Sequence, residues 1–553
     1  MTIAGRPEQT GEPDRLPSGR RRRSDQRRLA GLLLAAALLG AACGRVAEAR
    51  HAPAADPLTD SSWPTFGGSP AHESVNLDET AIDTTSASRL RRAWSVQLPD
   101  LADERPVLAG SLLMPDRTRH DVLFVTTDNG TLVALDSASG AKFWAVTPKN
   151  HNSKYTKSSP AIDLERNLVY SYGLDGSVHR FKATSGQEML GNGWPVTVTR
   201  MPLSEKVSSA LNLVNGYLYV TTASFSGDAP PYQGHLVTIE VKTGATHVFN
   251  SLCNDHTHLL ALNECQANGG GIWARPGVEQ DPITGNIFFT TSDGEYTASQ
   301  KGQNWGDTVI EMTPDGTKVL DSYTPENFAS EAFQNRDLGS VAPTLLPTLP
   351  GSRTPYLAVQ GGKEGLLRLL NRQDLSGRGG PAHVGGELQT VSLPDQCPTL
   401  AQPVAWQDPA AGDIWVFVAT LCHMDAFRVV TSLQGTTKLQ PAWYLGVQAT
   451  SPMISGGVLF AATSESLLAI DPRTGRQLWS SGDAAGGTIG HIHWESPIAV
   501  GGRVYCSDES NHLTAYGISP ATSAIRAAAL GLVSRRSRPP SPSSDRRPRA
   551  REP

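Results

Sequence analysis

The sequence predicts an all-β protein, an eight-bladed β-propeller of four-stranded antiparallel blades that is closed by an N-terminal strand. The first observation is a repeated phrase: LLAIDPRTGRQLW at 467–479 recurs as LVALDSASGAKFW at 132–144, with weaker copies beginning at Val178, Leu236 and Val309. The second is composition, because 53 Gly, 39 Pro and only 18% charged residues favour many turns and few long helices. A chain of 553 residues also exceeds the size at which one layered core keeps growing. Repeats escape that limit, because each unit packs only on its neighbours.

Each part of the phrase has a structural interpretation. Alternating apolar residues indicate a strand, Asp-Pro-x-Thr-Gly indicates a tight turn, and polar residues followed by one Trp indicate a returning outer strand. We expect Trp144 and Trp479 to wedge between adjacent blades, with a packing role and no cofactor contact.

The repeat units begin at turn residues that lie about 45 to 67 positions apart, which is the spacing of four-stranded propeller blades with loop insertions. A β-sandwich has comparable strand spacing but does not repeat a whole four-strand phrase. The eight openings are near Pro106, Pro160, Ala210, Pro276, Pro343, Pro403, Pro452 and Pro497.

The two ends of the repeat region are incomplete units that complement each other. The last unit stops after its third strand, and LRRAWSVQL at 90–98 is a return strand with no preceding unit. Pairing 93–98 with 513–518 would close the ring and remove exposed sheet edges.

The segments outside the propeller differ in composition from it. Residues 1–43 contain a basic region, a short apolar run and small residues, which is typical of an export signal; 44–61 is a linker and 519–553 a disordered basic tail. Cys43 resembles the lipidated cysteine of a bacterial lipoprotein box, although Gly40 stands where that box prefers Leu. Ordinary signal cleavage near residues 47–49 is the alternative. The Arg pairs also permit a twin-arginine export signal. Basic ends leave an acidic body, which disfavours nucleic-acid binding.

The remaining cysteines of an exported chain predict disulfides. We expect Cys253–Cys265, which brackets an insertion, and Cys397–Cys422, with Cys506 left as a buried thiol. Zinc binding by Cys253, Cys265 and the two intervening histidines is the alternative, although the spacing matches no usual zinc pattern. His491 and His493 would face opposite sides of a strand.

The repeats resemble those of the pyrroloquinoline quinone (PQQ) propeller family, whose phrase apolar-x-Ala-x-Asp-x-x-Thr-Gly-x-x-x-Trp matches both full copies. The SWPTFGG start at residue 62 is also similar, so the resemblance covers 62–518. It implies a propeller fold but not a function, because such propellers serve quinone-dependent dehydrogenases, envelope-assembly lipoproteins and other exported proteins.

In the dehydrogenases of this family, PQQ and Ca²⁺ lie near the propeller axis. The resemblance implies Trp273 as the aromatic floor, Lys363 as the cation beside the quinone, and Asp228 and Asp293 as oxygen ligands of the metal. Glu326 and Asp337 are the available substitutes for the family's catalytic base. Adjacent cysteines, which form the lid in the enzymes, and a Cys-x-x-Cys-His haem motif are both absent from the sequence.

The sequence therefore supports three hypotheses. The favoured one is an exported, lipid-anchored, monomeric binding module of the periplasm or cell surface, with a small ligand or an envelope protein as partner. The alternatives are a PQQ-dependent oxidoreductase of alcohols or sugars and an envelope assembly scaffold. The insertions at 250–270 and 296–306 argue against the scaffold.

Overall fold

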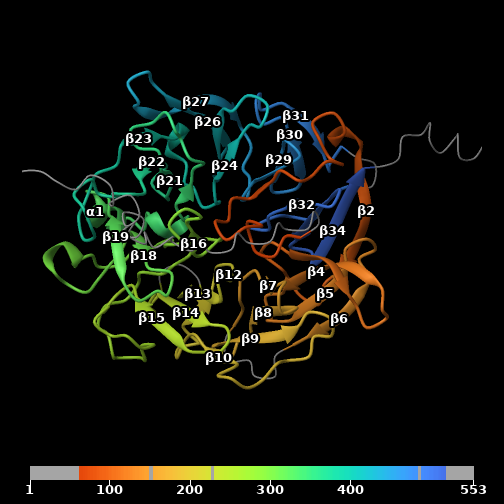
Figure 1. The fold of residues 1–553 in the computed structure, drawn as a ribbon, viewed down its shortest axis with the longest axis horizontal. Helices are drawn as coiled ribbons and strands as arrows, with labels where there is room; N and C mark the ends of the chain where they lie inside the picture. The colour runs from red at the N-terminus through yellow and green to blue at the C-terminus, as the bar shows by residue number, and fades with distance from the viewer. Residues whose placement is uncertain (1–61, 148–153, 226–228, 484–486, 519–553) are drawn as a thin grey trace, which may run out of the picture. The chain divides into compact units, whose positions relative to one another are not determined.

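The computed structural model describes residues 62–147, 154–225, 229–483 and 487–518, which form eight antiparallel sheets arranged as a ring (Figure 1). The signal segment with Cys43, the linker, Asp228 and the basic tail lie outside the described residues. The predicted eight-bladed propeller is confirmed, and each innermost strand begins within a few residues of a predicted opening. No helix within the described residues is long and apolar enough to cross a membrane.

In each blade the strands follow from the innermost to the outermost. Blades 1 to 4 contain β3 (Val107–Leu113), β4 (Arg119–Thr126), β5 (Leu132–Asp136), β6 (Lys142–Val146); β7 (Ala161–Asp163), β8 (Leu168–Tyr172), β9 (Ser177–Lys182), β10 (Val196–Thr197); β12 (Asn212–Val214), β13 (Tyr217–Ser224), β14 (His235–Glu240), β15 (Thr246–Asn250); and β16 (Glu279–Gln280), β17 (Ile287–Thr290), β18 (Val309–Met312), β19 (Val319–Tyr323). Blades 5 to 8 contain β20 (Thr344–Leu345), β21 (Leu357–Gln360), β22 (Leu366–Asn371), β23 (Gln389–Ser392); β24 (Val404–Gln407), β25 (Ile414–Ala419), β26 (Met424–Thr431), β27 (Thr437–Leu445); β28 (Met453–Ser455), β29 (Val458–Ala462), β30 (Leu467–Ile470), β31 (Gln477–Ser480); and β32 (Ile498–Val500), β33 (Arg503–Asp508), β34 (His512–Ile518), β2 (Leu90–Gln97).

A few elements lie outside this pattern. The short strand β11 (Glu205–Val207) pairs with the second half of β13, and β1 (Val75–Asn76) adds to β28 in parallel. Only one α-helix occurs in the described part of the chain, α1 (Phe328–Phe333), together with short 3-10 segments at Ala87–Arg89, Ala298–Gln300, Leu338–Ser340 and Pro394–Gln396.

The ring closes as the sequence predicts. Strand β2 pairs antiparallel with β34, from Leu90 opposite Ile518 to Gln97 opposite His512. Figure 1 shows the two strands side by side, although they come from opposite ends of the colour scale. Blade 8 therefore takes its outermost strand from the N-terminal side of the chain, and no blade is left with three strands.

 Pairs of Trp and Gly recur among the repeats of this chain and join neighbouring blades. In the pair formed by Trp144 and Gly186, the Trp144 indole donates a hydrogen bond to the Ala183 carbonyl of the next blade at 3.0 Å. The ring lies on Gly186, which has a φ of +69°, and a Cβ atom there would be 2.7 Å from the ring. The predicted wedge is confirmed, and Trp479 likewise packs on Tyr516 of blade 8, with ring centroids 5.2 Å apart. Two further pairs of this kind are Trp94 on Gly140 and Trp443 on Gly475.

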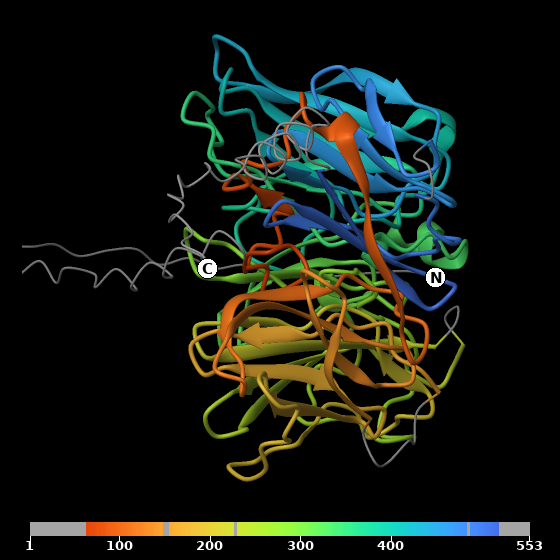
Figure 2. The ribbon, with the colours of Figure 1, turned by 90° about the vertical axis from the view of Figure 1, so that its right-hand side faces the viewer.

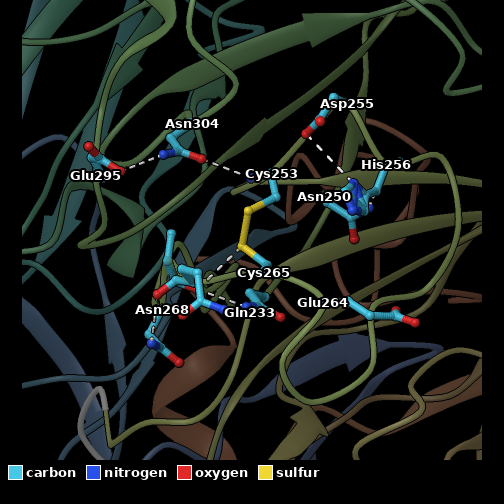
Figure 3. Close-up of a disulfide and its surroundings, with 12 residues drawn as sticks. Gln233, Asn250, Cys253, Asp255, His256, Glu264, Cys265, Asn268, Glu295 and Asn304 are labelled. Atoms are coloured by element: carbon cyan, nitrogen blue, oxygen red, sulfur yellow. Dashed lines mark hydrogen bonds and ion pairs between the residues drawn. A yellow bond between two sulfur atoms is a disulfide. The ribbon is translucent and has the colours of Figure 1, made fainter.

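Both predicted disulfides form, between Cys253 and Cys265 and between Cys397 and Cys422. Figure 3 shows that the first one fastens its insertion to a neighbouring loop, because the Asn304 side chain accepts a hydrogen bond from the Cys253 backbone at 2.8 Å and donates one to Glu295 at 2.6 Å. The disulfide excludes the zinc alternative for these thiols. Cys506 is a buried free thiol, as predicted.

Candidate functional site

A pocket of about 350 Å³ lies where the blades converge, at the end of the ring at which the innermost strands begin. Its walls come from loops that precede the innermost strands of seven blades, with further residues from the loops that follow β13 and β21. The volume is in the range of small-molecule sites. The lining residues are Asp103, Tyr155, Lys157, Lys206, Ser208, Phe225, Trp273, Arg275, Asp337, Ser340, Lys363, Leu400, His493 and Trp494.

Residues 62–76, which we call the plug segment, occupy the central channel beyond the pocket. Its backbone bonds to the innermost strands of several blades, with the Pro64 carbonyl accepting from Ile162 and the Pro70 carbonyl accepting from Gln280, both at 2.9 Å. The fully buried Arg105 donates to the Phe66 carbonyl of the plug segment and also to the backbone before blade 7. These contacts tie the plug segment across the channel. The views in Figures 1 and 2 place this red-to-orange stretch among the innermost strands.

Aromatic rings form one part of the pocket wall. Tyr155 and Phe225 meet edge to face with centroids 5.2 Å apart, and Trp273 lies beside them on the loop before blade 4. The buried indole nitrogen of Trp273 has no hydrogen-bond partner among the described residues. The half-buried ring offers a stacking surface for a planar molecule.

Three of the basic side chains in the pocket are paired with carboxylates. Lys157 contacts Asp103 at 2.5 Å and Asp128 at 2.8 Å, and Arg275 pairs with Glu104. Burial alone would raise the pKa of Asp103, but His493, Arg275 and Lys157 lower it to about 2. Lys363 completes the set: it pairs with Asp337 and donates to Asn335 at 2.8 Å. These pairs hold the side chains in fixed positions, while burial raises the pKa of Glu104 to about 8 and that of Asp128 to about 6.

Lys206 differs from the other basic residues. Only 5% of it is exposed, and no carboxylate in the described parts of the chain forms an ion pair with it. Its ammonium group donates to the Phe225 carbonyl at 2.9 Å and lies 4.5 Å from the centre of the Tyr155 ring. Burial, followed by the charges of Arg275 and Lys157, lowers the pKa of Lys206 to about 7. The pocket therefore contains one amine that is close to half neutral at physiological pH.

The structure brings together three of the site residues predicted from the sequence: Trp273, Lys363 and Asp337 all line the pocket. It does not bring Glu326 or Asp293 to the same wall. Glu326 is exposed, and its carboxyl group lies against Gly385. Asp293 is buried on a loop, and its backbone carbonyl accepts a hydrogen bond from the Gly270 N–H at 2.6 Å. Asp228 lies outside the described residues, so its predicted role remains a prediction.

Sequence reasoning missed several residues of the pocket, chiefly Lys157, Lys206, Arg275 and Asp103. Their shared signal is position, because each precedes the innermost strand of its blade by a few residues. His493 also follows this rule: the expectation of a strand at His491 and His493 is wrong, since both lie in the loop before β32. Both imidazoles approach Glu509, at 2.7 and 3.7 Å.

No group of three or more His, Cys, Asp or Glu side chains in the described residues is placed to hold a metal ion. The aromatic wall and the basic residues fit a planar, anionic quinone. The predicted pair of metal ligands does not fit, because Asp293 is not part of the pocket. We therefore derive no chemical step through a bound metal ion.

Comparison with known proteins supports the same fold. Residues 63–171 match the family described as the β-propeller domain of glucose/ethanol/alcohol dehydrogenase, and residues 382–528 match that of the outer membrane protein assembly factor BamB. No curated protein matches the sequence.

Solved structures of similar fold include quinoprotein enzymes. The quinohemoprotein alcohol dehydrogenase ADHIIG from Pseudomonas putida HK5 is 13% identical with a TM-score of 0.58, and the match covers 88% of this chain and 82% of that one. A europium-containing methanol dehydrogenase is 16% identical with a TM-score of 0.59, covering 83% and 98%. The quinohemoprotein alcohol dehydrogenase from Comamonas testosteroni is 13% identical with a TM-score of 0.58, covering 84% and 82%. At these identities the likeness establishes the fold alone.

The fold and the pocket define an eight-bladed propeller with an axial pocket of about 350 Å³. The repeat phrase and the two family matches identify it further: the chain is a PQQ-like β-propeller.

Proposed function

We propose that this protein is an exported, lipid-anchored binding module that takes a small, planar, anionic ligand in its axial pocket. The observation that carries the proposal is an aromatic wall beside a lysine that forms no ion pair with a carboxylate of the described residues: Trp273, Tyr155 and Phe225 lie beside Lys206. An anion placed there would gain a charge-assisted hydrogen bond while its ring stacks on the wall. Export and anchoring rest on the sequence of residues 1–43.

The plug segment favours a ligand over a protein partner at the axis. Because it crosses the channel, a ligand has to approach from the face at which the innermost strands begin. A closed end restricts the site to molecules of small size. A partner protein would have to bind the loops around the mouth or the outer rim.

A PQQ-dependent oxidoreductase is the second candidate, and one specific observation favours it. Trp273, Lys363 and Asp337 were each predicted from the family resemblance, and they line one pocket. Bound PQQ would supply a carbonyl centre that accepts a hydride or an electron pair. Trp273 would carry the ring, Lys363 would be the cation beside it, and the Asp337 carboxylate could accept a substrate proton.

An envelope assembly scaffold is the third candidate. The similarity of residues 382–528 to the BamB family supports it. Such a role would place the functional contacts on the outer surface of the blades and would leave the charged groups of the axial pocket without a function.

Titration with PQQ tests the binding proposal. Added PQQ should quench the tryptophan fluorescence of the purified protein saturably, both without and with Ca²⁺. Trp273→Ala should weaken the binding at least about tenfold, since a stacking contact is worth roughly 1 kcal/mol beyond its buried area. Trp443→Phe, which changes an inter-blade tryptophan, is the matched control and should bind as the wild type does.

The same samples separate the first two candidates. Dye-linked oxidation of a panel of alcohols and sugars in the presence of PQQ and Ca²⁺ would support the oxidoreductase, and Asp337→Asn should abolish it. Saturable binding without turnover would support the binding module. The absence of any spectral or fluorescence change would contradict both.

A further inference from the structure

Lys206 is held rigidly in the pocket wall. It lies at the centre of β11, where it is paired with Ala223 of β13. Successive side chains of a strand point to opposite faces, so the neighbouring Glu205 is directed away from the pocket. Glu205 is fully buried there and accepts a hydrogen bond from the Gln233 backbone at 2.9 Å. The nearest carboxylate in the sequence therefore does not neutralise Lys206.

The surroundings of Lys206 disfavour its charged form. Burial removes its amine from water, and this cost outweighs the attraction of the Tyr155 and Trp273 rings, whose centres lie 4.5 and 5.8 Å from the nitrogen. Lys157 and Arg275, the nearby cations, repel it, and Asp103 and Asp128 attract it only from a distance because they are engaged with Lys157. A lysine that is desolvated and close to other cations is an activated nucleophile.

We propose that Lys206 is a nucleophilic amine that forms an imine with an aldehyde or ketone group of a planar, anionic ligand in the axial pocket. This inference rests on the proposed ligand-binding function and adds the chemical class of the ligand. It also distinguishes Lys206 from Lys157 and Lys363, which form ion pairs with Asp103 and Asp337.

The step requires no oxidant or reductant. The neutral amine of Lys206 attacks the carbonyl carbon, a C–N bond forms, and the carbonyl electron pair moves to oxygen, which takes up a proton. Nitrogen gives up one proton, which yields the carbinolamine; its hydroxyl oxygen then takes up a second proton and leaves as water as the C–O bond breaks, and loss of the last nitrogen proton leaves the C=N bond. The product is an imine that water can hydrolyse, so capture is reversible.

Pyridoxal 5′-phosphate is a suitable probe, because it is a planar aromatic aldehyde with an anionic group. The full-length protein is incubated with the probe near pH 7, reduced with borohydride and digested, and the modified lysines are identified by mass spectrometry. At that pH an ordinary lysine is almost entirely protonated, whereas Lys206 is about half neutral. We therefore expect modification of Lys206 at least about tenfold faster than that of the exposed Lys318 or of Lys363.

Pyridoxine 5′-phosphate, which carries an alcohol in place of the aldehyde, separates this inference from the proposed function. It should bind in the pocket, quench tryptophan fluorescence and protect Lys206 from modification. If pyridoxine 5′-phosphate binds but pyridoxal 5′-phosphate forms no adduct at Lys206, the inference is overturned and the binding function stands. Failure of both compounds to bind or react would overturn both.

Lys206→Met provides a second test, because it retains most of the side-chain volume and removes the amine. The variant should lose the adduct and its near-ultraviolet absorbance band, while Lys318→Met, which changes an exposed lysine outside the pocket, keeps both. Labelling that is spread over exposed lysines, or that persists in Lys206→Met, would contradict the proposal.

Discussion

Replacing Gly186 with Ala tests the contact that joins one blade to the next. Gly186 has a φ of +69°, and an added Cβ would meet the Trp144 ring at 2.7 Å and Val146 at 2.8 Å. The left-handed backbone costs an alanine about 1 kcal/mol, and overpacking adds about 1–3 kcal/mol. We expect Gly186→Ala to lower the free energy of unfolding by about 2–4 kcal/mol.

Gly412 offers a matched control. It occupies a similar turn, with a φ of +75° and its N–H donating to the Asp408 carbonyl at 2.7 Å, as Gly186 donates to Lys182 at 2.9 Å. No atom lies within 4 Å of a Cβ built at Gly412, so Gly412→Ala should cost only about 1 kcal/mol. Urea denaturation followed by circular dichroism compares the two. Equal losses would refute the inter-blade contact, as would a Gly186→Ala loss that persists undiminished in a Trp144→Ala background.

Three further predictions follow from the structure and the sequence. Replacing both Cys253 and Cys265 with Ser should cost up to about 3 kcal/mol of local stability and expose residues 251–268 to limited proteolysis. Unchanged cleavage would show that the hydrogen bonds of Asn304 hold the insertion in place without the disulfide. The pKa of Asp103 is lowered from 3.8 to about 2, so its contribution of about 2 kcal/mol is present above pH 4 and is lost as the pH falls toward 2. The stability gap between wild type and Asp103→Asn should therefore narrow over that range in urea unfolding, and a constant gap would contradict the assignment. Cys43→Ser should release the protein from the membrane fraction of cells, whereas a protein that is soluble with Cys43 intact would refute lipid anchoring.

The architecture was predictable because the repeat phrase is a local signal. The Asp and Gly of each turn and the Trp of each return strand are set by backbone geometry and by contact with the next blade, so their spacing survives in the sequence. The closing strand was predictable for the same reason, since Trp94 stands on Gly140 as Trp144 stands on Gly186.

The site was less predictable, because it is assembled from loops whose lengths vary between blades. Family position pointed to Trp273 and Lys363, which follow short Gly-rich turns and both line the pocket. Glu326 and Asp293 do not line the pocket, because Glu326 is exposed beside Gly385 and Asp293 is buried on the loop that follows β17. The environment of Lys206 could not be inferred at all, because its aromatic and cationic neighbours come from other blades.

The most direct measurement of the central claim is a crystal structure of the protein grown with PQQ. The account predicts the planar molecule in the axial pocket, with its ring against Trp273 and an anionic group within hydrogen-bond distance of the Lys206 amine. Density for PQQ on the outer rim of the blades, or an axial pocket filled only by solvent at saturating PQQ, would contradict it.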